Sequence, residues 1–242
     1  SLMLPTLGLV LLHNHRDISS TQERIIEEVD SDAREAEGAV ASWVSTHVNA
    51  AKIIGELGST YPLSPSSRLQ EELERIHALF PAFHNIFLGD ATCTTIAFHP
   101  MINERGESTI GINFADRAWF KQLSSSLQPT ISDIFMGRGG IFQPIFSISV
   151  PILQDGKFSH FGLGAVNVDK MSEFFARTRE HKELIHTVVD RNNNVVMSTD
   201  HSRKPLSPVP AKIGGQDIAV SANVYLWVPG NQKNISIMDV WQ

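Results

Sequence analysis

The sequence predicts an α+β fold, in which a long N-terminal helix precedes antiparallel strands with helices packed to one face. Three observations lead to this prediction. Apolar residues recur at spacings of three and four from Ile18 to Leu57, as in an amphipathic helix. After Pro81 the pattern changes to short β-branched and aromatic runs separated by turn residues, which is typical of strands. A second, smaller group of such runs begins near Leu184.

The first helical segment is long for a globular domain. Its apolar residues stack on one face, and charged residues occupy the other face. Gly58 followed by Pro62 is expected to end it. A helix of about 40 residues would be about 60 Å long, which is typical of a stalk or spine. The apolar face contains Ile25, Val29, Ala33, Ala36, Val40, Trp43, His47, Ala51, Ile54 and Leu57.

The remaining elements follow from local patterns. A second helix is expected to begin with Ser64 as its N-cap and Pro65 at its first helical position. Helical spacing returns at Asp116–Leu127 and Lys170–Thr187, and the polar segment Arg191–Asn194 indicates a hairpin turn. Strands are expected at Phe83–Leu88, Thr94–Phe98, Thr109–Asn113, Ile131–Phe135, Phe142–Leu153, His160–Asp169, Thr187–Asp190, Val195–Ser198, Ile218–Val228 and Asn234–Val240.

Composition narrows the function classes. Apolar residues make up 42% of the 242 residues, which indicates a folded globular chain. The net charge of −6 argues against a general nucleic-acid binder, because binding to phosphates needs a basic face. Cys93 is the only cysteine, so the chain can form no intramolecular disulfide and no thiolate metal cluster.

The segment Leu2–Leu12 is nearly all apolar. It is too short to span a bilayer, which takes about 20 such residues. We expect it to be the end of a transmembrane helix; the alternative is a buried or disordered N-terminal segment.

A set of short motifs occurs in fixed order between residues 114 and 169. These motifs are Asp116-Arg117-x-Trp119-Phe120, Ile131-Ser132-Asp133, Ser149-Val150-Pro151 before an Asp-Gly turn, and Gly164-x-x-x-Val168-Asp169. In order and spacing they resemble the double Cache (PDC-type, PAS-like) extracellular sensor domains of histidine kinases, diguanylate cyclases and chemoreceptors. No single motif is specific, and the resemblance is carried by their combination.

The resemblance implies two PAS-like antiparallel-sheet modules packed along the long helix. The second module of such domains commonly opens with a hairpin, here at Val188–Asn192. The expected division is residues 1–15 as a membrane-proximal stub or an added segment, 16–60 as the stalk helix, 61–183 as the membrane-distal, ligand-binding module and 184–242 as the membrane-proximal module.

The resemblance also implies a ligand site in the first module. Arg117 and Trp119 would lie on the helix that lines the pocket. A guanidinium group matches a carboxylate through two parallel hydrogen bonds, and an indole adds an apolar wall with one N–H donor. Asp169 would accept a hydrogen bond from the ammonium group of an amino-acid ligand.

The sequence departs from the amino-acid-binding pattern, which expects tyrosine hydroxyl groups near the arginine. Phe120, Phe135 and Ile112 occupy those places. Because discrimination by hydrogen bonding is lost with its donors, an amino acid is only one candidate, beside a carboxylate or a related small metabolite. In the alternative interpretation, Asp116 and Arg117 pair with each other or cap the helix, and the tryptophan is part of the core.

The segment Met136–Gly140 contains Arg138 between glycines. We expect a hairpin loop over the pocket, from which Arg138 reaches in; the alternative is an anion site made by backbone N–H groups. The segment lacks the ending and context of a P-loop. The complete set of predicted ligand-binding residues is Arg117, Trp119, Phe120, Asp133, Phe135, Arg138 and Asp169.

No catalytic, metal or cofactor site is expected. The histidines do not have the spacing of metal-binding pairs, and no Gly-x-Ser-x-Gly motif occurs. Cys93 lies in a strand-like, threonine-rich stretch, where a core position is the simpler interpretation.

These observations predict the periplasmic small-ligand sensor region of an inner-membrane signalling receptor, with a histidine kinase as the preferred output and a diguanylate cyclase or chemoreceptor as the alternative. Two hypotheses of other classes remain. One is a structural module that forms a homodimer through the apolar face of the long helix. The other is a soluble α+β hydrolase.

Overall fold

The computed structural model describes residues 31, 35–36, 38–178, 185–209, 212–213, 216–217, 224–228 and 231–236. The long N-terminal helix covers residues 38–60, and residues 31, 35 and 36 are helical as well. It is followed by α2 (Ser67–Leu79), β1 (Phe83–Asp90), β2 (Thr95–His99), α3 (Ala118–Ser126), β3 (Thr130–Ile131), β4 (Phe135–Met136), β5 (Pro144–Gln154), β6 (Lys157–Asn167) and α4 (Val168–Thr178). Then come β7 (Ile185–Val189), β8 (Val195–Ser198), β9 (Lys212–Ile213), β10 (Gln216–Asp217), β11 (Val224–Val228) and β12 (Asn231–Ser236).

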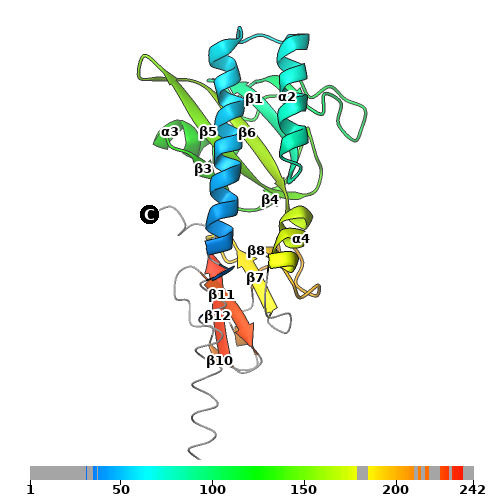
Figure 1. The fold of residues 1–242 in the computed structure, drawn as a ribbon, viewed down its shortest axis with the longest axis vertical. Helices are drawn as coiled ribbons and strands as arrows, with labels where there is room; N and C mark the ends of the chain where they lie inside the picture. Colours follow the sequence, from blue (N-terminus) through cyan, green and yellow to red (C-terminus); the bar gives the residue numbers. More distant parts are fainter. Residues whose placement is uncertain are drawn as a thin grey trace, which may run out of the picture.

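The strands form two main sheets, one beyond the other along the molecule (Figure 1). The first has the order β2-β1-β6-β5-β3, with β4 also paired to β5, and all its pairings are antiparallel. The second has the order β11-β12-β7-β8. Its β7–β12 pairing is parallel, unlike the antiparallel pairing expected, because a long connection between the two strands lets the chain return in the same direction. The predicted α+β class with a long N-terminal helix is confirmed.

The long helix lies along one face of the first sheet (Figure 1), and its apolar residues belong to the core on that face. Val40, Ala51 and Ile54 are fully buried in this core, which also includes residues of the second sheet. The approach is close: a Cβ atom on Gly162 would lie 2.1 Å from the carbonyl oxygen of Ala51 and 2.3 Å from the amide nitrogen of Gly55. The described part of the predicted apolar face is therefore buried within the chain itself, and a dimer through this helix would need its other face.

The end of the long helix and the start of α2 both differ from the prediction. The helix continues through Gly58 to residue 60, because this glycine serves a close contact: an added Cβ would lie 2.5 Å from a ring carbon of His160. The next helix, α2, begins two residues later than expected. Its N-cap is Ser66 and not Ser64, and the Ser66 hydroxyl accepts a hydrogen bond from the amide of Leu69 at 3.2 Å.

Several predicted strand segments are also different. The expected strand Ile131–Phe135 is divided into β3 and β4. Thr109–Asn113 forms an isolated bridge to Thr94 and not a strand, because Gly111 turns the chain with a φ of +81°. The strand expected to reach Asp169 ends at Asn167. The Asn167 side chain accepts a hydrogen bond from the amide of Asp169 at 2.9 Å, as an N-cap does, and so starts α4 earlier than predicted.

Alternate residues of the first sheet face two separate cores. Ile86 and Leu88 belong to the core beneath the long helix and α2. Phe87, which lies between them in β1, belongs to a second, aromatic-rich core with Trp119 and Leu123 of α3. A strand directs successive side chains to opposite faces, so the site described below lies on the face that α3 covers.

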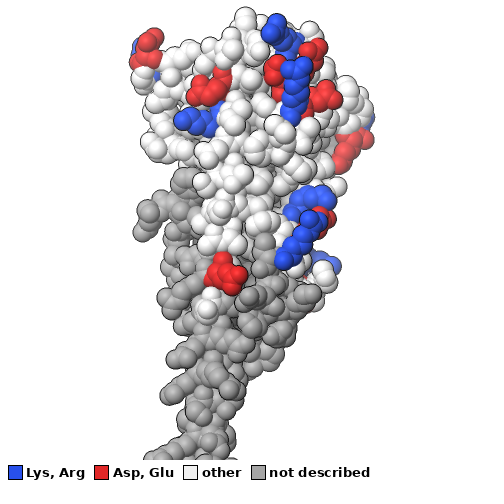
Figure 2. Space-filling model, in the orientation of Figure 1, with Lys and Arg blue, Asp and Glu red and all other residues white. Residues whose placement is uncertain are grey.

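The described surface carries small groups of mixed charge. Arg75 pairs with Glu72 on α2, and Lys170 pairs with Glu173 on α4, both at 3.0 Å. Groups of both signs are visible on the face in Figure 2, with uncharged surface between them. Exposed pairs of this kind add little to stability.

None of the helices in the described ranges has both the length and the apolar run required to cross a bilayer. The segment Leu2–Leu12 and residues 18–30 of the expected long helix lie outside the described residues.

Candidate functional site

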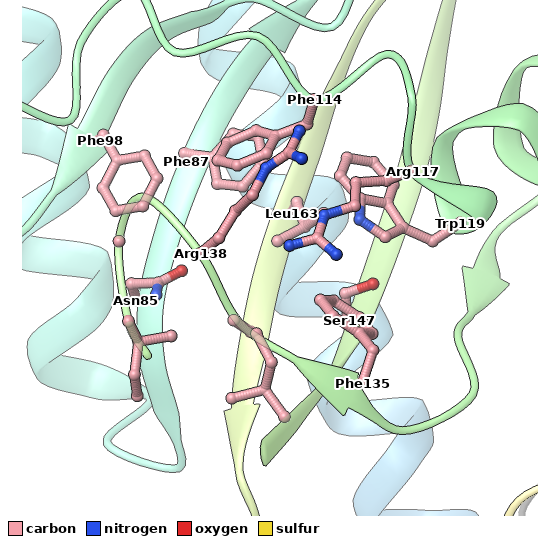
Figure 3. A pocket seen from close by; sticks show the side chains of 14 residues that line it. Asn85, Phe87, Phe98, Phe114, Arg117, Trp119, Phe135, Arg138, Ser147 and Leu163 are labelled. Atoms are coloured by element: carbon pink, nitrogen blue, oxygen red, sulfur yellow. The ribbon is translucent and has the colours of Figure 1, made fainter. Parts of the chain in front are cut away.

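A small pocket lies between the first sheet, α3 and the loop that follows β4 (Figure 3). Its cavity volume is about 30 Å³. Its walls are mainly aromatic and aliphatic with a few polar groups, which is typical of small-molecule sites. The lining residues are Asn85, Phe87, Phe98, Phe114, Arg117, Trp119, Phe135, Arg138, Gly140, Ile141, Ile145, Ser147, Leu163 and Ala165.

The start of α3 places the first two predicted residues in this pocket. Arg117 is the N-cap of α3; its backbone is extended, and its side chain makes no capping hydrogen bond. Trp119 is buried in the first turn, where its ring lies 5.7 Å from that of Phe161 on the sheet. The Arg117 guanidinium lies 5.3 Å from the ring centre of Phe135 and donates to the carbonyl oxygen of Met136 at 3.3 Å.

Arg117 forms no ion pair with any carboxylate among the described residues. Burial lowers its pKa, and the neighbouring guanidinium of Arg138 lowers it further. Asp116 instead pairs with Arg138, with 2.9 Å between Nη1 and Oδ2. Asp116 and Arg117 therefore form no ion pair, although Arg117 is the N-cap of α3 and Trp119 is buried in the core, as the alternative interpretation expected. Arg117 faces the pocket without an ion-pair partner among the described residues.

Two polar residues that the sequence analysis missed line the opposite wall. Ser147 on β5 is buried, and its hydroxyl group has no hydrogen-bond partner among the described residues. Asn85 on β1 is buried as well. A signal did exist, since each is a polar residue inside an apolar strand run. Buried polar groups are nearly always hydrogen-bonded, so an unpaired one beside a cavity points to a missing partner.

The loop after β4 lies over the pocket. Gly139 has a φ of +81°, and Asn103 holds its carbonyl oxygen with a 2.6 Å hydrogen bond from Nδ2. A Cβ atom on Gly140 would lie 2.4 Å from Cζ of Phe98, so only glycine allows this approach. The loop contributes Arg138 to the pocket lining.

The structure brings together some of the predicted residues and separates the others. Those that line the pocket are Arg117, Trp119, Phe135 and Arg138. Phe120 points elsewhere: it is buried in the aromatic core, 5.7 Å from the ring of Phe161 and 6.1 Å from that of Phe158.

Asp133 lies beside a second cavity of about 230 Å³, whose lining shares Arg117, Trp119 and Phe135 with the pocket. Both carboxylate oxygens of Asp133 are engaged by the turn between β7 and β8. Arg191 Nε donates to Oδ1 at 2.7 Å, and the Asn192 side chain donates to Oδ2 at 3.1 Å. These bonds tie Asp133 to the second sheet.

Asp169 is exposed on α4 and lines a separate cleft of about 400 Å³, which has basic residues such as Lys204 in its lining. It does not line the pocket that contains Arg117. The predicted cradle for a zwitterion, with a guanidinium at one end and this carboxylate at the other, is therefore not formed.

Comparison with known proteins gives the fold. No protein-family model and no curated protein matches the chain. Among solved structures, the ligand-binding domain of the Pseudomonas fluorescens chemoreceptor CtaA in complex with L-valine is similar, with a TM-score of 0.61 at 16% identity over 76% of this chain and 80% of that one. The sensor domain of the V. cholerae histidine kinase DctB has a TM-score of 0.58 at 18% identity over 76% and 70%. The chain has the fold of a Cache-type sensor domain.

An extracellular ligand-binding receptor from Desulfohalobium retbaense shares this sensor fold, with a TM-score of 0.57 at 17% identity. The match covers 76% of this chain but only 32% of that receptor. At these identities the likeness shows the fold alone.

The single cysteine of the chain, Cys93, lies in the core of this fold. Cys93 is buried, and this burial raises the pKa of its thiol. A thiol of this kind reacts slowly, because the thiolate is the nucleophile. Within the described residues, His, Cys, Asp and Glu side chains form no group of three or more that could hold a metal ion.

Proposed function

We propose that this chain is the extracytoplasmic small-ligand sensor region of a transmembrane signalling receptor, and that the ligand binds in the pocket around Arg117. One observation carries the proposal. Among the described residues, a guanidinium group without a carboxylate partner and a buried hydroxyl group without a hydrogen-bond partner face the same apolar pocket. In this proposal residues 61–183 form the ligand-binding module and residues 184–242 form the membrane-proximal module.

The contacts around the pocket support a route for the signal. A ligand shifts a conformational equilibrium only by binding its states with different affinities. Phe135 lines the pocket, and Asp133, two residues earlier, is bonded to Arg191 of the second sheet. The long helix packs on the opposite face of the same sheet. Movement of the β3–β4 segment would therefore reach both the second module and the helix.

Ligand binding is testable on the purified chain. Thermal-shift screening against amino acids, carboxylates and amines, followed by calorimetry, should identify a ligand that stabilises the protein. Arg117→Ala should weaken its binding about tenfold or more, because it removes a hydrogen bond to a charged group from a half-buried site. Arg75→Ala is the matched control, since Arg75 lies on α2 in an exposed ion pair. A ligand that binds both variants equally would contradict the proposed site.

For the receptor as a whole, we propose a histidine kinase in the inner membrane, with this region in the periplasm. Its sensor-domain fold occurs both in the histidine kinase DctB and in the chemoreceptor CtaA. The coding sequence that follows Gln242 tests the output. A kinase core would support the proposal, whereas a cyclase or chemoreceptor signalling domain would contradict it.

A further inference from the structure

The pocket lining points to a class of ligand. We infer that the pocket around Arg117 binds a short carboxylic acid that carries a hydroxyl or carbonyl oxygen and has no ammonium group. This inference rests on the proposed function, which makes the pocket a ligand site, and it goes further by excluding the α-amino acids that some proteins of this fold bind, such as CtaA with L-valine.

The charges of the lining favour an anion. Arg117 and Arg138 both line the pocket, and no aspartate or glutamate does. The nearest acid of this group, Asp116, is paired with Arg138 at its outer side, where its side chain is 59% exposed. A carboxylate would thus meet a guanidinium fork that matches its geometry. An ammonium group would meet the uncompensated charge of Arg117 and the Arg138 charge that Asp116 offsets, with no carboxylate among the described lining residues.

Four of the five aromatic rings that line the pocket are already engaged by other groups. Aromatic faces attract cations, but the guanidinium groups already lie over two of them, Arg117 at 5.3 Å from Phe135 and Arg138 at 5.9 Å from Phe114. Phe87 and Phe98 stack against each other, with ring centres 5.1 Å apart and planes inclined by 4°. These rings can pack against carbon atoms of the ligand but leave little open face for an ammonium group.

The polar groups on the sheet indicate which group the ligand carries beside its carboxylate. In Figure 3 the Arg117 guanidinium points into the middle of the pocket, with Ser147 below it and Asn85 on the far side. A carboxylate bound to Arg117 would bring the next atoms of the ligand toward the Ser147 hydroxyl. Since this hydroxyl lacks a partner among the described residues, an oxygen on the ligand would supply one.

The cavity size favours a short acid. A volume of about 30 Å³ is two to three times the ~10–15 Å³ that a single water needs on such a scale. The pocket as it stands therefore fits a few heavy atoms.

Calorimetry on the full chain can test this with three matched probes. L-Lactate, L-alanine and propionate share a three-carbon acid skeleton and differ in carrying a hydroxyl group, an ammonium group or neither. We expect lactate, or its oxo analogue pyruvate, to bind at least about tenfold more tightly than alanine or propionate. Ser147→Ala should weaken lactate binding about tenfold and leave propionate binding unchanged. The control Arg75→Ala should change neither.

The outcomes separate this inference from the proposed function. If alanine or another amino acid binds as tightly as lactate and depends on Arg117, the ligand class is wrong and the proposed sensor site stands. If lactate, pyruvate and glycolate all fail to bind the folded protein, the inference is also overturned. If a ligand binds but is insensitive to Arg117→Ala, the site itself is wrong.

Discussion

Arg191, in the turn between β7 and β8, donates a hydrogen bond from Nε to Asp133 Oδ1 at 2.7 Å. The same guanidinium reaches the side-chain oxygen of Gln122 on α3 at 3.2 Å. These contacts join the second sheet to the segment between β3 and β4, two residues from Phe135 in the pocket. The structure thus connects the candidate site to the second sheet through a pair that is 58 residues apart in the sequence.

This pair should contribute measurably to stability. The side chains are 37% and 33% exposed, so we expect a coupling energy of about 1 kcal/mol, at the upper end for an ion pair near the surface. A double-mutant cycle with Arg191→Gln and Asp133→Asn in urea unfolding measures it. Arg177→Gln is the control, because Arg177 is highly exposed and its contact with Glu173 is 3.8 Å long. Additive effects of the two substitutions would contradict the coupling.

The Ser147 hydroxyl should lower the stability of the ligand-free protein, although it serves ligand binding. Its buried hydroxyl has no partner among the described residues, so Ser147→Ala should raise the free energy of unfolding of the ligand-free protein by about 1 kcal/mol. Ser149→Ala is a matched control on the same strand, since the Ser149 hydroxyl donates to the carbonyl oxygen of Thr130 at 3.3 Å. That substitution should lower stability. A loss of stability in Ser147→Ala, measured by chemical denaturation, would speak against an unpaired hydroxyl.

The contact between the long helix and the sheet should tolerate no side chain at Gly162. A Cβ atom there would lie 2.1 Å from a backbone oxygen of the helix, and backbone cannot move aside without displacing the helix. We expect Gly162→Ala to cost about 3 kcal/mol or more, seen as a lower midpoint in thermal and urea unfolding. Gly38→Ala, with nothing within 4 Å of the added atom, should instead stabilise by about 0.5–1 kcal/mol.

Acid should destabilise the domain through its buried histidines. Burial lowers the pKa of His160 and of His47 below the usual 6.5. Well above pH ~6.5 both histidines are neutral in the folded and unfolded states, so their titration does not change the free energy of unfolding. Below pH ~6.5 the unfolded chain binds protons that the folded chain does not. The free energy of unfolding therefore decreases as the pH is lowered.

Urea midpoints between pH 7.5 and 5.5 measure this dependence. His160 Nε2 lies 3.1 Å from the carbonyl oxygen of Gly55, a bond that the amide of His160→Gln could replace without titrating. This variant should lose part of the pH dependence. An unchanged slope would show that His160 is not a source of it.

The structure places some of the predicted site residues together and others apart, and their role in ligand binding stays a prediction. Arg117 and Trp119 were expected in one pocket from their motif, and both line it. Asp169 was expected there too, but the Asn167 cap starts α4 before it, and the residue then follows the helix into another cleft. One capping hydrogen bond was enough to change the assignment, because it decides where a strand ends.

The sequence by itself determined the α+β class, the long helix and the face that this helix buries, since these depend on the periodicity of neighbouring residues. Val40 and Ile54 are buried as their spacing predicts. Tertiary structure alone decided which arginine has a carboxylate partner. Arg138 reaches Asp116 across 22 residues, which leaves Arg117 to face the pocket, because ion pairing depends on distances in space that spacing along the chain does not encode.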